Sequence, residues 1–511
     1  MRDAMQRSIP STKNSSSISV PHKMHTLDWD YISEGGKHAI YAYNPKESNP
    51  EDNRFQGEIL RIEKALFQHD DAASVLISIP IQSSRTESQM RIMQLLFNQS
   101  GKQIYVDPPV EIELHPSFLE GLRQRAIESG RIPHSRRLDW NIERCSHKEG
   151  TCAKEVSAMA SLLPNYRCCK SIHPKHGTTT KSISVEIKPK AGYLATSPLV
   201  HPNHDVKYQI SKFQILQQLN YDGVVSKGWN KGTGLGEKSR YDPLDLFSCN
   251  GVMIRQAIEA LFGCPQNNLK IFCDDDMLYG HDGQGRHPTS TRSAVTETNK
   301  YSQALEAILD GDLQNPQESK GILECELVEI LSGVLLQDPF LPLLLDLQKR
   351  FDVLDADGAV LVYNRLVELC DGSKKKAEDL IDADLQLSDS TECTDLLNYL
   401  SSWTSPPNDE SRQSWYNRGK ELVEQLSAKD CIGLLQNWLI SLTLCDISFF
   451  VIISKVNDGD LADADCQHRL VQTKAGHLLQ YEIKVVDYDY KPGKKLRNRE
   501  QSESKIALFA G

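Results

Sequence analysis

The order of the periodic patterns along this chain constrains its fold more than any other feature. Strand-like alternation comes first, on both sides of a glycine pair at 35–36 and again at 182–190. Helical spacing of apolar residues then dominates from Tyr301 to about Leu444. Two strand-like apolar runs follow, at 447–456 and 480–490. Strands and helices that are segregated rather than alternating predict an α+β fold.

The same patterns predict a division of the 511 residues into lobes. Residues 1–25 are polar and rich in serine, which predicts a disordered leader. Residues 26–180 predict a strand-rich first lobe, in which the segment 140–182 is expected to be irregular. Residues 181–500 predict a larger mixed lobe with a helical insert at about 300–440, and residues 501–511 form a tail.

Charge and hydropathy narrow the class of protein. A net charge of −11 argues against a general nucleic-acid binder, yet basic residues collect from Lys484 to Arg499, which indicates a confined anion site. No run of about 18 apolar residues occurs, so we expect no membrane span. The N-terminus lacks the apolar core of a signal peptide, and the 13 cysteines are scattered. We expect an intracellular protein of the cytoplasm or nucleus, with reduced thiols, acting as a monomer.

Two lysines and a carboxylate share one face of the strand-like stretch Val185–Lys190. Because side chains alternate along a strand, Glu186, Lys188 and Lys190 point to the same side. Lysines suit phosphate groups, and a neighbouring carboxylate can hold a ribose hydroxyl or orient a lysine. A solvated strand face that ends at a Lys-Pro bend explains the same pattern, so both interpretations stay open at this point.

Carboxylates stand where two apolar elements end. Asp446 joins an apolar helical pattern to an apolar strand, and Asp487 and Asp489 stand where a strand meets a Lys-Pro bend. A kinase needs one carboxylate to orient and deprotonate the attacking hydroxyl, and another to hold Mg²⁺ on the nucleotide phosphates. Structural caps are the alternative interpretation.

Two further patterns carry little weight alone. The pair Gly35 and Gly36 suits a loop over phosphates, but it equally suits a plain hairpin turn. Cysteines and histidines gather between Cys145 and His176, where their spacing matches no standard zinc knuckle. We predict no zinc there.

Several stretches together resemble one family. They are DWDYISEGG, VEIKPKAGYL, YDPLDLFS, AIEALFGCPQNNLKIF, SLTLCDIS and VVDYDYKP, spread from about Leu27 to Arg499. Their order and spacing resemble the plant-like form of the inositol-pentakisphosphate 2-kinases, whose EIKPK signature matches Glu186–Lys190. The resemblance implies a two-lobed kinase-like fold with an inositide-binding insert. It also implies transfer of the γ-phosphate of ATP, with Mg²⁺, to the 2-hydroxyl of inositol pentakisphosphate, which gives inositol hexakisphosphate (phytate).

By matching position, the resemblance implies roles for single residues. It implies Asp446 as the catalytic base with Lys188 beside it, and Asp487 as the ligand of Mg²⁺. The implied ATP contacts are Gly35, Gly36, Lys37, His38, Arg61, Asn165, Arg167, Glu186, Lys188, Lys270 and Asp487. The implied substrate contacts are Arg137, Lys190, Asn267, Asp446, Lys491, Lys495 and Arg499.

The chain departs from the family pattern at several of these places. Compared with that pattern, Glu58, Cys445 and Asn220 stand in place of lysines, Leu216 in place of a histidine and Arg499 in place of a tyrosine. Of the plant-like zinc site, Cys370 is the one ligand that remains nearby, and Leu361 stands where its first histidine falls, so we predict no structural zinc.

The departures leave two alternatives beside the kinase. The first is a catalytically weakened protein of the same fold that binds inositol phosphates without turnover, because losing positive charge near the inositide weakens phosphate contacts. The second is a scaffold that binds RNA or chromatin through residues 484–499, against which the acidic total weighs.

Overall fold

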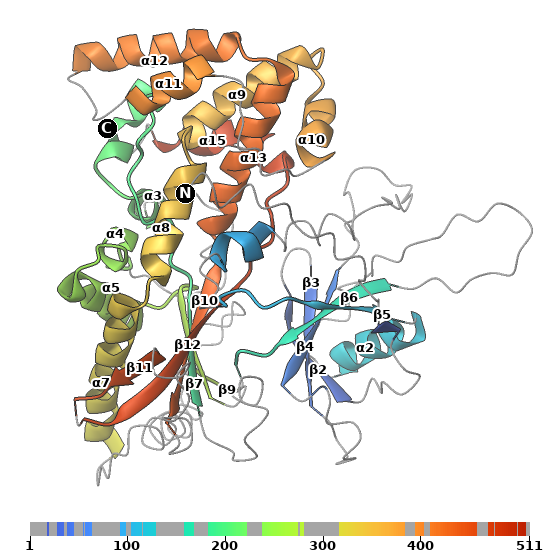
Figure 1. Cartoon of the computed structure of the whole chain (residues 1–511), viewed down its shortest axis with the longest axis vertical. Helices are drawn as coiled ribbons and strands as arrows, with labels where there is room; N and C mark the ends of the chain where they lie inside the picture. The colour runs from blue at the N-terminus through green and yellow to red at the C-terminus, as the bar shows by residue number, and fades with distance from the viewer. Residues whose placement is uncertain are drawn as a thin grey trace, which may run out of the picture. The chain divides into compact units, whose positions relative to one another are not determined.

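The structure is a computed structural model of the whole chain, shown in Figure 1. It describes residues 18–19, 28–34, 38–44, 55, 57–63, 92–98, 104–114, 116–128, 158–167, 182–221, 238–273, 276–280, 316–383, 394–402, 409–456, 469–474, 476–497 and 499–506. The chain forms two compact units. Unit 1 comprises Met1–Ser83, Asp107–Asn165 and Lys170–Pro174, and unit 2 comprises Ser84–Val106, Tyr166–Cys169 and Lys175–Gly511.

Unit 1 contains a six-stranded sheet in the order β1-β5-β6-β4-β3-β2, antiparallel except for the pair β1–β5. Helix α2 packs against it, and the two bury a core that includes Trp29, Tyr41, Leu60 and Leu122. The strand bounds are β1 Ile18–Ser19, β2 Trp29–Glu34, β3 His38–Tyr43, β4 Glu58–Glu63, β5 Val110–Leu114 and β6 Ala158–Pro164, and α2 spans Pro116–Glu128.

Unit 2 contains a second six-stranded sheet, antiparallel throughout, in the order β11-β12-β10-β7-β8-β9. Its central strands are buried on both faces, which explains the uninterrupted apolar run Phe449–Ile453 in β10. The strand bounds are β7 Ser182–Ile187, β8 Leu269–Cys273, β9 Asp276–Gly280, β10 Ser448–Lys455, β11 Leu470–Gln472 and β12 Leu478–Val486.

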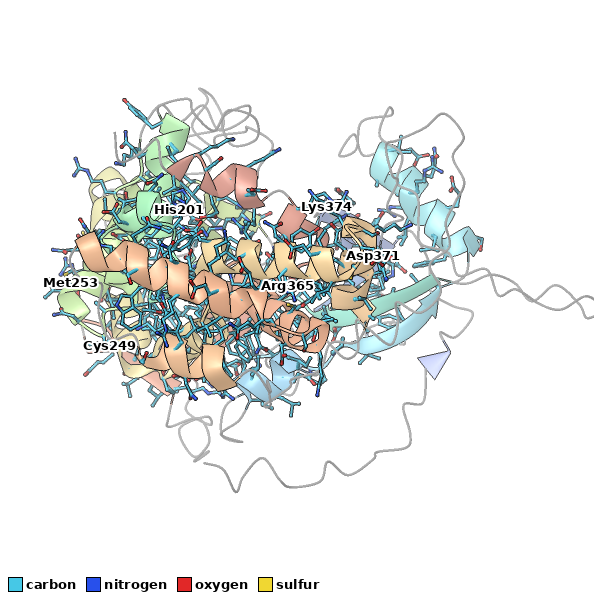
Figure 2. All side chains as sticks on the ribbon, turned by 90° about the horizontal axis from the view of Figure 1, so that it is seen from above. His201, Cys249, Met253, Arg365, Asp371 and Lys374 are labelled. Carbon is cyan, nitrogen blue, oxygen red and sulfur yellow. The ribbon has the colours of Figure 1, made fainter. Side chains whose placement is uncertain are left out.

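Helices make up most of the rest of unit 2. Helix α13 packs against α8 and α9 and leads directly into β10 (Figure 1). Lys374, which begins α10, and Asp371, in the turn before it, are exposed; Figure 2 labels both. Besides a helical stretch at 92–97, the bounds are the 3-10 helix η5 Pro202–Tyr208, α3 Lys212–Tyr221, α4 Pro243–Leu246, α5 Gly251–Gly263, α7 Pro316–Gln337, α8 Phe340–Phe351, α9 Asp355–Leu369, α10 Lys374–Ala383, α11 Thr394–Ser402, α12 Asp409–Glu424, α13 Ala428–Leu444, α14 Lys494–Arg497 and α15 Arg499–Glu503.

The two sheets and the helices confirm the predicted α+β class, including the two closing strands β10 and β12 and the amphipathic helix α5. Two expectations were wrong in part. The segment 140–182, expected to be irregular, contains β6, whose Ala- and Ser-containing sequence becomes a strand because it pairs with both β4 and β5. Ile18 and Ser19, in the expected disordered leader, pair with β5. The Cys/His segment 145–176 lies outside the described residues except for 158–167.

Taken singly, none of the described helices is both long enough and apolar enough to cross a membrane, and one pair, Glu324–Gln337 with Phe340–Leu369, passes the same test only together across a 59° bend.

Candidate active site

The register of the second sheet brings three predicted site residues together at one end of its inner strands β7, β10 and β12. β10 is antiparallel to both β7 and β12, with Phe449 opposite Ile187 and Ser448 opposite Val486. The start of β10 and the ends of β7 and β12 therefore meet. Asp446 precedes β10, Lys188 follows β7 and Asp487 follows β12.

Three lysines converge on Asp446. The Nζ of Lys491 lies 2.7 Å from Oδ2, and the Nζ atoms of Lys190 and Lys188 lie 3.2 and 3.4 Å from Oδ1. Burial alone would raise the pKa of Asp446, but the three ammonium groups hold that pKa well below its usual range. The Asp446 side chain is still 39% exposed, so a ligand can reach its carboxylate.

The pKa values of two of these lysines shift in opposite directions. Burial lowers the pKa of Lys190, and the nearby charge of Lys188 lowers it further. The attraction of Asp446 raises this pKa by less, so the pKa of Lys190 is lowered overall. Burial also opposes the charged form of Lys188, but Asp446 and Asp487 outweigh it and raise the pKa of Lys188. Positive groups packed this closely favour an anionic ligand that would relieve their repulsion.

A second charged pair links neighbouring strands. Glu186 in β7 stands opposite Lys270 in β8, and the Lys270 Nζ lies 3.3 Å from both carboxylate oxygens. Burial would raise the pKa of Glu186, but Lys270 and then Arg167 outweigh it and lower that pKa. The Arg167 guanidinium also lies 4.7 Å from the centre of the Phe272 ring. Glu186 is therefore a buried, ionised carboxylate with fixed cationic neighbours.

Two site residues adopt left-handed backbone conformations. Lys190 has φ 65° and Asp487 has φ 59°. Residues other than glycine rarely adopt positive φ values of this kind. The exposed Asp487 carboxylate accepts a hydrogen bond of 3.3 Å from the Ser448 hydroxyl. Such conformations cluster at functional sites, where the surrounding structure holds them.

The basic residues after β12 continue from Asp446 along α14 and α15. Burial lowers the pKa of Lys495, and so do the like charges of Lys491, Arg499 and Lys494. The Arg499 guanidinium lies 5.5 Å from the centre of the Trp438 ring and 3.7 Å from Glu503. These cations lie close enough to influence the pKa of Lys495, and such a group of positive charges suits a ligand with several phosphates.

The structure places the remaining predicted residues as follows. Arg61 lies half-buried in β4, and His38 begins β3. The backbone N–H of the buried Asn165 donates a 2.7 Å hydrogen bond to the carbonyl of Gly57. Asn267 is exposed in the turn before β8. Gly35, Gly36, Lys37 and Arg137 lie outside the described residues.

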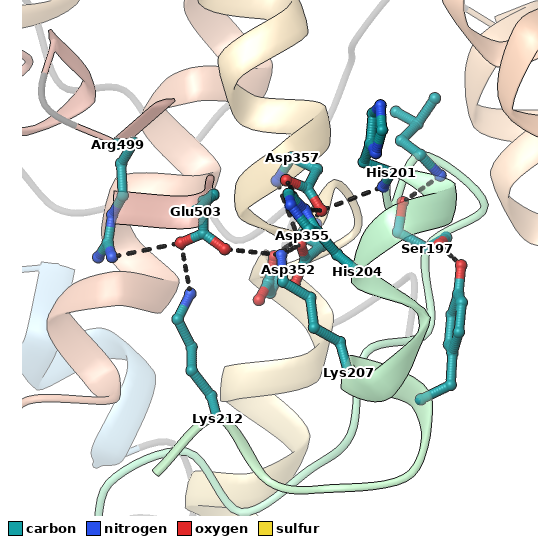
Figure 3. Close-up of polar contacts among 12 residues, drawn as sticks. Ser197, His201, His204, Lys207, Lys212, Asp352, Asp355, Asp357, Arg499 and Glu503 are labelled. Carbon is teal, nitrogen blue, oxygen red and sulfur yellow. Dashed lines mark hydrogen bonds and ion pairs between the residues drawn. The ribbon is translucent and has the colours of Figure 1, made fainter. Parts of the chain in front are cut away.

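Three buried carboxylates elsewhere in unit 2 have metal-like spacing, because oxygens of Asp355, Asp357 and Glu503 lie within 4.8 Å of one another. The Nζ of Lys207 already lies 2.6, 2.9 and 2.7 Å from them (Figure 3). The ammonium group of Lys207 therefore occupies the place that a metal ion would take. No sequence pattern indicated this cluster, because its members come from η5, α9 and α15.

Comparison with known proteins agrees with this geometry. The family model described as inositol-pentakisphosphate 2-kinase matches residues 31–505. The chain belongs to the inositol-pentakisphosphate 2-kinase family. Among members of that family, it is 24% identical to the inositol-pentakisphosphate 2-kinase of Arabidopsis thaliana over 503 residues, which is 94% of this chain and 93% of that protein. It is also 24% identical to that of Oryza sativa subsp. indica, over 96% of this chain and 95% of the relative.

A shorter match, 28% identical over 154 residues, links 30% of the chain to 29% of the inositol-pentakisphosphate 2-kinase of Danio rerio. Family membership confirms the predicted class, a kinase of the transferase type with ATP as the phosphate donor and an inositol phosphate as the acceptor.

Proposed function

We propose that this chain is an active, Mg²⁺-dependent member of the family, which phosphorylates the 2-hydroxyl of inositol pentakisphosphate to give inositol hexakisphosphate. The observation that carries the proposal is the convergence of Lys188, Lys190 and Lys491 on the carboxylate of Asp446. One carboxylate among several ammonium groups matches an acceptor whose reacting hydroxyl is flanked by phosphates.

Asp446 is the proposed general base toward that hydroxyl. Without substrate, its three lysine partners make it a weak base, because they hold its pKa well below the usual range. Substrate phosphates that attract Lys190 and Lys491 would weaken this hold and raise the pKa of Asp446. The base would then gain proton affinity when a phosphorylated acceptor is bound. Most of the rate would come from positioning and charge neutralisation.

The proposed nucleotide contacts on unit 2 are Glu186, Lys188, Arg167 and Lys270. The ionised Glu186 suits a ribose hydroxyl or the orientation of Lys270, and the cations suit phosphates. The exposed carboxylate of Asp487 fits the preference of Mg²⁺ for oxygen ligands. When bound, Mg²⁺ neutralises charge on the nucleotide phosphates.

The proposed substrate contacts continue along Lys190, Lys491, Lys495, Arg499 and Asn267. Support comes from the crowded cations around Lys495 and from the exposure of Asn267.

We further propose that the two compact units correspond to the two lobes of a kinase-like fold. Contacts by Gly35, Gly36, Lys37, His38, Arg61, Asn165 and Arg137, a monomeric state and an intracellular location stay predictions from the sequence.

The test is incubation with ATP, Mg²⁺ and inositol pentakisphosphate, followed by separation of the inositol phosphates by anion exchange. Formation of the hexakisphosphate supports the proposal.

The departures at Glu58, Cys445 and Leu216 favour a second candidate, a binding protein without turnover. Tight calorimetric binding of inositol hexakisphosphate, with no product and no ATP binding, would favour it and refute the kinase.

A further inference from the structure

Hydrogen bonds fasten the loop that carries the signature lysines at Lys188, Pro189 and Tyr193. The N–H of Lys188 donates to the carbonyl of Asn268 at 2.9 Å. The hydroxyl of the fully buried Tyr241 donates to the carbonyl of Pro189 at 2.7 Å. The hydroxyl of Tyr193 lies within hydrogen-bond distance of Ser441 on α13, at 3.3 Å. Residues 188–193 are therefore bonded to three separate segments of the chain.

Gln348 on α8 supplies the contacts in the middle of this loop. Its side chain is completely buried. The Oε1 atom accepts from the N–H of Gly192 at 3.0 Å, and the Nε2 atom donates to the carbonyl of Lys190 at 3.0 Å. The same Nε2 also donates to the carbonyl of Leu444, at 3.2 Å. One amide therefore uses its acceptor and both donors on backbone atoms of two separate segments.

The two segments are those that carry the reacting groups. Lys190 has a left-handed backbone, so the direction of its carbonyl depends on a partner such as Gln348. Leu444 ends α13 and stands two residues before Asp446. The Ser441 hydroxyl also donates to the backbone carbonyl of Gln348, at 3.1 Å, which fastens α13 to α8 once more.

Close packing limits the movement of the loop toward Phe247 but supplies none of the hydrogen bonds that Gln348 makes. A Cβ atom on Gly192 would lie 2.1 Å from the ring of Phe247, so this backbone approaches its neighbour as closely as glycine allows. The bonds from Gln348 therefore set where the loop lies along α8, while packing sets how near it lies to Phe247.

We propose that Gln348 is a positioning residue for phosphoryl transfer: its amide fixes the distance between the loop of Lys190 and the segment of Asp446. This inference rests on the proposed function of those two residues. Gln348 itself touches no reacting group. Its loss is expected to affect the chemical step more than ligand binding, because small misplacements of reacting groups reduce rate steeply.

The test uses Gln348→Glu, which keeps the size of the side chain and the acceptor for Gly192. It replaces Nε2, which donates to both Lys190 and Leu444, by a carboxyl oxygen that can donate to at most one of them. We expect kcat to fall roughly 100-fold, with KM values for ATP and inositol pentakisphosphate changed less than about threefold. The matched control is Gln436→Glu, in α13, whose buried amide donates to the carbonyl of Ile381 at 2.9 Å. Its kcat should stay within about threefold of wild type.

Amide hydrogen exchange gives a readout that does not depend on turnover. Peptides covering 188–193 and 444–446 should exchange faster in Gln348→Glu and should exchange at the wild-type rate in the control. Gln348→Met, which also removes the acceptor for the N–H of Gly192, should show the same faster exchange and serves if the first variant does not fold. Equal exchange and equal kcat in a folded Gln348 variant and wild type would overturn the inference. An inactive wild type whose loop loosens in the variant would instead contradict only the proposed function.

Discussion

Replacing Lys207 by alanine tests how the buried charges of unit 2 are balanced. The side chain of Lys207 is 3% exposed, and its ammonium contacts three carboxylates. Burial opposes its charged form, but Asp355, Glu503 and Asp357 outweigh that effect and raise the pKa of Lys207 well above its ordinary value. The variant would leave these carboxylates with fewer cationic partners, among them Lys212, 3.4 Å from Glu503, and His204, 3.0 Å from Asp357.

The expected cost follows from burial. Removing one partner of a buried ion pair costs about 3–5 kcal/mol, because it leaves an uncompensated charge in a poorly solvated place. In a unit of this size that corresponds to a fall in melting temperature on the order of 10 °C. The matched control is Lys212→Ala, whose side chain is 30% exposed and makes one long contact in this cluster. Its cost should be about 1 kcal/mol or less.

Differential scanning fluorimetry without nucleotide measures both variants, and added Ca²⁺ tests the cluster further. The space left by Lys207→Ala is surrounded by carboxylate oxygens within 4.8 Å of one another, so Ca²⁺ can take the place of the ammonium. At tenfold excess over its dissociation constant, it would restore about 1.4 kcal/mol in the variant. Equal melting temperatures for the two lysine variants, or stabilisation by Ca²⁺ in wild type but not in Lys207→Ala, would refute the reasoning.

Two further predictions concern single charges. Burial, with the charge of Asp107 nearby, raises the pKa of Glu58 from 4.5 to about 7. Between these two pH values the folded unit retains a proton that the unfolded chain has released. The free energy of unfolding therefore falls as the pH rises from 4.5 to about 7. Glu58→Gln should remove this slope in denaturation measured across that range, and an unchanged slope would assign it elsewhere. Lys270→Met should raise KM for ATP about tenfold, because Glu186 loses its cross-strand partner and the nucleotide loses a cation, while KM for the inositol phosphate changes less than about threefold. Equal effects on both substrates in steady-state kinetics would contradict the assignment.

Local patterns were sufficient to predict the elements that carry the site. Alternation predicted the strand that presents Glu186, and helical spacing predicted α5 and α13, because these signals depend on neighbouring residues. The meeting of Lys188, Lys190 and Lys491 at Asp446 needed the strand register, which places β7, β10 and β12 side by side.

The sequence could not reveal groups that act across long separations. Gln348 is a single glutamine in an apolar helix, and only the tertiary fold brings its amide to Lys190 and Leu444. Lys207 and Glu503 were missed for the same reason, since ordinary lysines and glutamates are expected at the surface. The strand β6 was missed because pairing on both sides, rather than its own composition, makes it extended.

The most direct test of the central claim compares binding with turnover in Asp446→Asn. Removing the negative charge frees Lys188, Lys190 and Lys491 from their shared partner, so calorimetric binding of inositol hexakisphosphate should be equal to or tighter than in wild type. Formation of the hexakisphosphate from inositol pentakisphosphate and ATP should fall by about a thousandfold, because the base is gone. Turnover near the wild-type rate in a folded Asp446→Asn variant would contradict the account, as would a loss of binding that alone explains the loss of product.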